Sequence, residues 1–154
     1  MQWSSLAGTA LGALIGVSAT LFADRLRWRL GRQDMDKATK RQTYADYLAA
    51  LSNTRNELRG AARDESVVLA DRARRAVEAF KAGEAYELRY QVELIAPGAV
   101  IDASDKAFRA LRKLRDLVEA GALHTEKLYI SQRDLWETEF AELRRQMKDD
   151  LAGS

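Results

Sequence analysis

The sequence predicts an all-α protein, with a single N-terminal transmembrane helix followed by a cytoplasmic bundle of about four helices whose neighbours are antiparallel. Three observations predict this class. The first 23 residues carry no charged side chain, the apolar residues beyond residue 41 recur at helical spacing, and the 154-residue chain has only one Pro and nine Gly. About 20 apolar helical residues cross a bilayer core, whereas a β fold is rich in turns.

The charge distribution predicts how the apolar run is oriented. Residues 24–41 hold seven basic and three acidic side chains, whereas residues 42–154 hold 18 basic and 20 acidic ones. Because positive flanks stay on the cytoplasmic side, we expect the N-terminus outside and the C-terminus in the cytoplasm, with the chain in the cell (inner) membrane. The predicted domains are a transmembrane helix over 1–23, a basic juxtamembrane segment over 24–41 and the bundle over 42–154.

Two other interpretations of the apolar run remain open. A signal peptide cleaved after Ala23 would leave only the remainder, although no positive residue precedes the run as such peptides require. Alternatively, the run is a core helix or an arm of a soluble helical oligomer, because it is rich in Ala, Gly and Ser rather than Leu.

Small residues recur every fourth position along the predicted span, in the pattern of a glycine zipper. Such a ridge lets another helix approach closely in lipid, where van der Waals packing drives association. We therefore expect self-association into a homo-oligomer through one face, formed by Ser4, Gly8, Gly12, Gly16 and Thr20.

The arginines that follow the span predict contact with membrane lipid. Each contributes on the order of 1 kcal/mol near an anionic surface. The alternative is that they serve only to fix the topology. The residues in question are Arg25, Arg27, Arg29 and Arg32.

Helical spacing predicts the first two helices of the bundle. Gly60 and the polar stretch over 62–66 end the first, with Asp64 or Ser66 available to cap the next. Its buried stripe is formed by Tyr44, Leu48, Leu51, Leu58 and Ala62. The second spans about 66–95, with a buried side formed by Leu69, Ala73, Ala76, Val77 and Phe80. Residues 86–94 also alternate as a strand would, but no partner strand exists, so we expect a helix.

The last two helices follow the Pro97-Gly98 turn. The third spans about 98–120 and ends at Gly121, with a buried stripe formed by Val100, Ala103, Ala107, Leu111, Leu114 and Val118. The fourth is capped by Ser131, with Asp134 three residues on. Its stripe is Leu135, Trp136, Phe140, Leu143, Met147 and Leu151, and residues 122–130 are either a loop or an earlier start of this helix.

No residue pattern points to catalysis, a cofactor or a metal. The chain has no Cys and one His, His124, which is not accompanied by a nucleophile or carboxylate relay. Glu137, Glu139 and Glu142 form an acidic cluster without the Glu-x-x-His pairs of a di-metal bundle. Phosphate-binding glycine loops and nucleophile elbows are absent from the sequence. We therefore expect no enzyme and no catalytic, cofactor-binding or metal residues.

A run of basic residues in the third helix allows three interpretations. It is a solvated bundle face, it pairs with the acidic fourth helix, or it binds nucleic acid; the last is disfavoured because no aromatic residues interleave the run. The run comprises Lys106, Arg109, Arg112, Lys113 and Arg115.

Two short motifs resemble a recurrent pattern in small, uncharacterised actinobacterial and actinobacteriophage single-span membrane proteins. The first is Y-A-x-[FY]-L-x-A, matched by residues 44–50, and the second is V-x-L-x-A-P, matched by residues 92–97. The resemblance implies a span and an Arg-rich flank ahead of the first motif, and it carries over no catalytic or ligand residue.

These observations predict a non-enzymatic, single-span membrane protein that self-associates and presents its bundle to an unidentified cytoplasmic protein. One alternative is a phage holin-like or toxin-like protein that permeabilises membranes, with Ser5, Thr9 and Thr20 lining a hydrated path. The other is the soluble helical oligomer described above.

Overall fold

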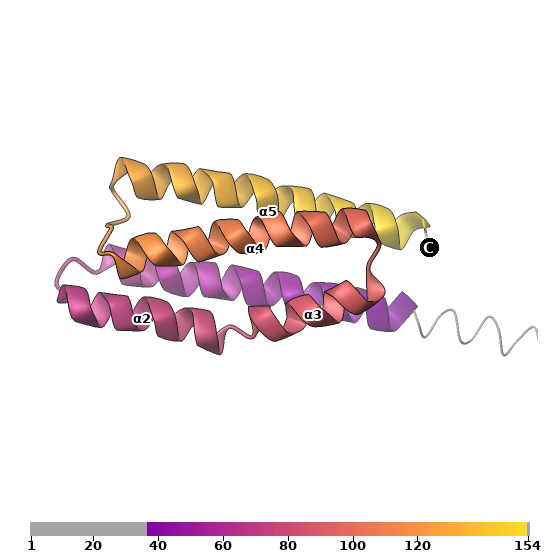
Figure 1. The fold of residues 1–154 in the computed structure, drawn as a ribbon, viewed down its shortest axis with the longest axis horizontal. Helices are drawn as coiled ribbons and strands as arrows, with labels where there is room; N and C mark the ends of the chain where they lie inside the picture. Colours follow the sequence, from indigo (N-terminus) through magenta and orange to yellow (C-terminus); the bar gives the residue numbers. More distant parts are fainter. Residues whose placement is uncertain (1–36, 154) are drawn as a thin grey trace, which may run out of the picture. The chain divides into compact units, whose positions relative to one another are not determined.

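The computed structural model describes residues 37–153, which form helices and short connections and, within that range, no strand. A first helix covers residues 37–63. It is followed by α2 (Leu69–Ala82), α3 (Ala85–Ile95), α4 (Gly98–Glu119) and α5 (Lys127–Gly153) (Figure 1). The predicted all-α bundle is therefore confirmed for this part of the chain, and α3 is a helix rather than a strand.

The helices alternate in direction, with α2 and α3 together taking the place of one long helix (Figure 1). Lys40 Nζ lies 2.6 Å from Asp150 Oδ2, and Arg55 Nη2 lies 2.8 Å from Glu137 Oε1. The start of the first helix thus lies beside the end of α5, and its later part lies beside the first half of α5. The two helices are therefore antiparallel neighbours. α4 packs against α5 on one side and α2 on the other.

The core is built from side chains spaced three and four residues apart on each helix. Tyr47, Leu51 and Leu58 of the first helix are fully buried, as is the whole predicted stripe of α4 to within 5% exposure. Burying a Leu side chain stabilises a fold by roughly 1.5–3 kcal/mol, so this stripe supplies much of the driving force. The Tyr47 hydroxyl and Ser104 Oγ are 2.9 Å apart, which satisfies two buried polar groups.

The prediction of one helix over residues 66–95 is wrong, because the helix is interrupted at Gly83 and Glu84. A Cβ atom at Gly83 would overlap the hydroxyl of Thr54 on the first helix, so only Gly allows this close approach. Glu84 has a φ of 52°, in the left-handed region that ends a helix. The chain therefore leaves α2 and starts α3 in a new direction.

Several predicted helix ends also need correction. The first helix ends at residue 63, within the predicted 60–66 stretch, but neither Asp64 nor Ser66 caps α2, whose N-cap is Val68. α5 begins at Lys127, four residues before Ser131, which is the earlier start that the sequence left open for residues 122–130.

In α2 and α5, the burial of individual residues differs from the predicted stripes. Leu69 is 55% exposed and Leu135 is 43% exposed, whereas Tyr129, which lay outside the predicted stripe, is 2% exposed. The third helix ends as predicted, since Gly121 takes a φ of 103° directly after it.

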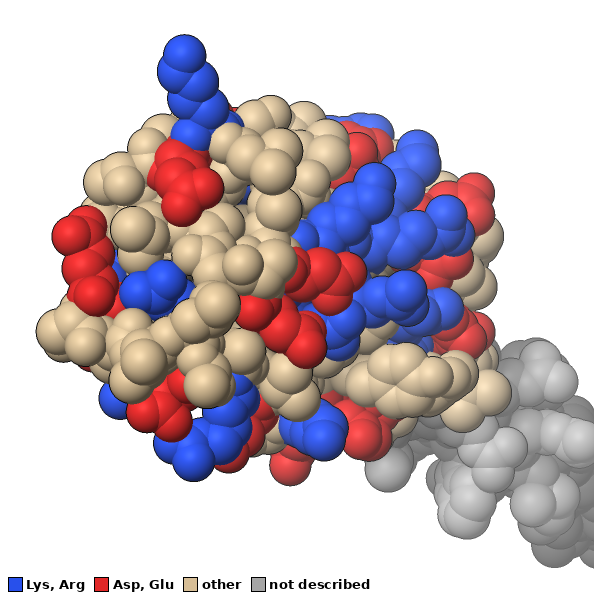
Figure 2. All heavy atoms as spheres, turned by 60° about the vertical axis from the view of Figure 1, so that its left-hand side comes forward, with Lys and Arg blue, Asp and Glu red and all other residues tan. Residues whose placement is uncertain are grey.

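A buried arginine holds together two connections at one end of the bundle. Arg72 of α2 is 7% exposed and donates to three backbone carbonyl oxygens: Gly121 at 3.0 Å, Asp64 at 3.1 Å and Val67 at 3.4 Å. It thereby ties the 64–68 connection and the start of α2 to the end of α4. Figure 2 turns this end toward the viewer and shows acidic and basic side chains interleaved around an uncharged area.

Candidate functional site

A groove of about 970 Å³ lies between the first helix and the α2–α3 pair, and we call it the acidic groove. Seven of its fifteen lining residues are alanine or glycine, whose small side chains leave space between the two sides. These are Ala49, Ala50, Gly60, Ala61, Ala79, Ala82 and Gly83.

Local sequence explains why the groove is open. Alanines occupy the facing sides of the first helix and α2, so no long side chain reaches across. At the α2–α3 break, Gly83 brings α2 against Thr54, and the chain then turns away into α3. The depth of the groove is therefore a consequence of small side chains rather than of a displaced helix.

The charged residues of the groove are predominantly acidic. Four carboxylates line it, those of Asp46, Glu57, Glu78 and Glu84, against the single guanidinium of Arg75. That guanidinium lies 3.3 Å from Asp64 outside the groove, so its charge is partly matched elsewhere. Among the described residues, the side-chain carboxylates of Glu57 and Glu84 make no hydrogen bond or ion pair. The groove therefore favours a cationic occupant.

The residues predicted to form the helix interface and the lipid contact lie outside the described residues. These are Ser4, Gly8, Gly12, Gly16 and Thr20 for the interface, and Arg25, Arg27, Arg29 and Arg32 for lipid. Within residues 37–153, no helix is long and apolar enough to cross a membrane.

The predicted acidic cluster is dispersed into ion pairs. Glu137 pairs with Arg55 of the first helix, whereas Glu142 accepts hydrogen bonds from Arg145 and Gln146 of its own helix. The bond from Arg145, then that from Gln146, lowers the pKa of Glu142 to about 2. In the described part of the chain, no group of three His, Asp or Glu side chains could hold a metal ion.

The basic run of α4 is exposed and partly paired along its own helix. Arg109 Nη2 lies 3.2 Å from Asp105, and Arg115 pairs with Asp116 while its guanidinium lies 4.7 Å from the Phe80 ring centroid. Lys106 is close enough to α5 to lower the pKa of Glu142, after the larger effect of the Arg145 hydrogen bond. The run thus has the local pairing expected of a solvated face.

Comparison with known proteins found no matching family model, no matching curated protein and no matching solved structure. The candidate site therefore depends on the geometry of the bundle.

Sequence reasoning missed the acidic groove, although a signal was present. Ala49, Ala79 and Ala82 lie at the edges of the buried stripes, and alanines at such positions leave a shallow surface. The α2–α3 break, which completes the groove, had no comparable signal beyond Gly83.

Proposed function

We propose that this protein is a non-enzymatic, self-associating membrane anchor whose bundle binds a helix of a cytoplasmic partner protein in the acidic groove. The single observation that carries the docking proposal is the combination of small groove walls with four carboxylates and one guanidinium.

The size and the walls of the groove favour a helix as the occupant. An α-helix with side chains is about 10–12 Å across and lays one face into an apolar groove through residues three and four apart. Alanine and glycine walls let its backbone come close. The described residues offer no strand edge to which an extended peptide could add.

The charge of the groove specifies the chemistry of that helix. A partner helix with small residues on its inner face and Lys or Arg on both flanks would place cations beside Glu57 and Glu84, whose carboxylates have no competing pair. Such pairs at the rim contribute chiefly to association rate and specificity, so binding should weaken with salt.

The anchor and the self-association rest on the sequence. The uncharged run of 23 residues supports membrane insertion, and the four-residue repeat of small side chains within it supports helix–helix packing. An oligomer would present several grooves together and raise the effective affinity for a partner that is itself multivalent.

The docking proposal is tested with two helical peptides of about 20 residues on an alanine-rich backbone, one flanked by Lys and one by Glu. The full-length protein should bind the Lys peptide and not the Glu peptide in fluorescence anisotropy. Glu57→Lys should weaken binding of the Lys peptide at least tenfold. Glu119→Lys, which introduces the same charge change outside the groove on α4, is the matched control and should leave it unchanged. Equal binding of both peptides would contradict the proposal.

A further inference from the structure

A second, smaller cavity of about 270 Å³ lies between the first helix and the N-terminal half of α5, and we call it the arginine cavity. It shares no lining residue with the acidic groove. Its walls come from the first helix, the α4–α5 connection and α5. They are formed by Arg55, Arg59, His124, Tyr129, Arg133 and Glu137.

Three buried polar atoms on these walls make no hydrogen bond with the protein. They are the Tyr129 hydroxyl, His124 Nδ1 and Arg55 Nε. Tyr129 is the most buried of the three residues, with 2% of its surface exposed. Buried polar atoms in folded proteins almost always have a partner, so three without one around a single cavity point to a polar occupant.

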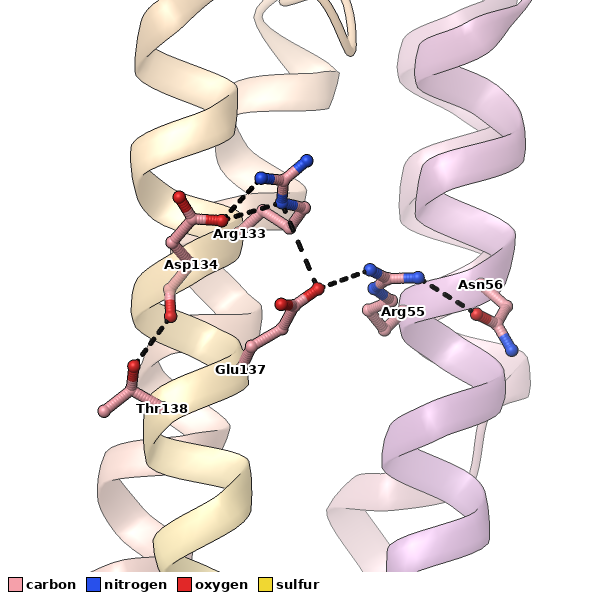
Figure 3. Close-up of polar contacts among 6 residues, drawn as sticks. All are labelled: Arg55, Asn56, Arg133, Asp134, Glu137 and Thr138. Atoms are coloured by element: carbon pink, nitrogen blue, oxygen red, sulfur yellow. Dashed lines mark hydrogen bonds and ion pairs between the residues drawn. The ribbon is translucent and has the colours of Figure 1, made fainter.

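The charges of the arginine cavity show the sign of that occupant. Three guanidiniums face one carboxylate, that of Glu137. Glu137 Oε1 lies 2.8 Å from Arg55 Nη2 and 4.0 Å from Arg133 Nε, so one carboxylate is shared by both arginines across the two helices (Figure 3). Arg133 also pairs with Asp134 at 2.6 Å. The Arg59 guanidinium makes no hydrogen bond or ion pair among the described residues.

The surroundings of Tyr129 favour its hydroxyl as a hydrogen-bond donor, because the nearby charged groups are arginines. Burial raises the pKa of Tyr129, while the positive charges of Arg55, Arg59, Arg133 and Arg63 act in the opposite direction. The hydroxyl therefore stays protonated at neutral pH and is able to donate to an anion. A planar guanidinium offers paired N–H donors that match phosphate oxygens.

We propose that the arginine cavity binds a phosphate group, with Arg59 and Arg133 contacting its oxygens and the Tyr129 hydroxyl donating to it. The net positive charge of the cavity walls, with three guanidiniums against one carboxylate, suits the negative charge of a phosphate group. The group could belong to a soluble phosphate ester or to a lipid headgroup, and the experiment separates these two sources.

The test uses the purified full-length protein and two probes. Inorganic phosphate is titrated by calorimetry at constant ionic strength, and vesicles of phosphatidylcholine with or without phosphatidic acid are tested by co-sedimentation. Arg59→Gln and Tyr129→Phe should each weaken binding about tenfold, the loss expected when one hydrogen bond to a charged group is removed. Arg112→Gln is the matched control, because Arg112 is an exposed arginine of α4 that also has no partner among the described residues.

Each outcome decides the proposal. Saturable binding of inorganic phosphate that is weakened by Arg59→Gln and Tyr129→Phe but not by Arg112→Gln supports it with a soluble ligand. Binding only to phosphatidic acid vesicles, with the same sensitivity, supports it with a lipid headgroup. Binding that Arg112→Gln weakens as much as Arg59→Gln is a general charge effect and overturns the proposal, as does the absence of binding to both probes. Circular dichroism of each variant confirms that the fold is retained, and Tyr129→Phe gives an independent result if Arg59→Gln unfolds.

Discussion

Replacing Arg72 by Met should lower the free energy of unfolding more than the same replacement of any exposed arginine. The Met side chain keeps most of the buried stem of Arg72 but has no donor for the carbonyls of Gly121, Asp64 and Val67. Two of these hydrogen bonds, at 3.0 and 3.1 Å, have good lengths, and the third is long at 3.4 Å.

The magnitude follows from these bonds. A hydrogen bond to a charged group contributes about 1.5–3 kcal/mol, and the cost of burying the Arg72 cation offsets part of the total. Since the loop carbonyls can partly recover water when Arg72 is removed, we expect a loss of about 2–4 kcal/mol in the free energy of unfolding. Arg72→Lys should fall between the wild type and Arg72→Met, because an ammonium reaches fewer of the three carbonyls.

Urea denaturation of the full-length protein, followed by far-ultraviolet circular dichroism, measures this loss. With a slope of about 2 kcal/mol per molar urea, the midpoint should fall by roughly 1–2 M. Arg74→Met is the control on the same helix. The Arg74 side chain is 65% exposed and makes only surface ion pairs with Asp71 and Glu78, so its loss should cost about 0.5 kcal/mol or less. An equal midpoint shift for both variants would refute the role given to Arg72.

Three further changes test other parts of the account. Burial raises the pKa of Tyr47 to about 12, so the stability it contributes is complete below pH 10 and is lost as pH rises from 10 to 12. Tyr47→Phe should flatten part of that decline in urea midpoints, and an unchanged pH profile would contradict it. Gly83→Ala should lower the free energy of unfolding by about 1–3 kcal/mol through overlap with Thr54. If the loss is equally large when Thr54→Ala is also present, the overlap is not its cause. Gly12→Ile should reduce the oligomer size in detergent while Leu11→Ile does not; an unchanged size would discard the small-residue ridge as an interface.

The sequence predicted the bundle well where side-chain periodicity was strong. All six positions of the α4 stripe are buried, because this helix packs between α5 and α2 and its apolar face is regular. Helix ends were predicted less well. Neither Asp64 nor Ser66 caps α2, since the Asp64 carboxylate accepts the Ser66 hydroxyl at 2.6 Å and pairs with Arg75, and α2 begins only at Leu69.

The alanines beside the stripes indicated a shallow surface, but the position and lining of the two cavities could not be predicted from one sequence. Both depend on how side chains of different helices meet. The pairing of Arg55 with Glu137 joins residues 82 positions apart, and no local pattern encodes it. Tyr129 illustrates the same limit, because its burial is set by the α4–α5 connection and the earlier start of α5 rather than by the stripe that begins at Leu135.

The most direct test of the docking proposal is to map where the Lys-flanked peptide binds by amide chemical shifts of the labelled full-length protein. The account predicts that shifts concentrate on residues that line the acidic groove, among them Ala49, Ala79 and Glu84, and that α4 residues such as Arg112 are unaffected. Shifts concentrated on α4 or α5, or no shifts at peptide concentrations that saturate the anisotropy signal, would contradict it.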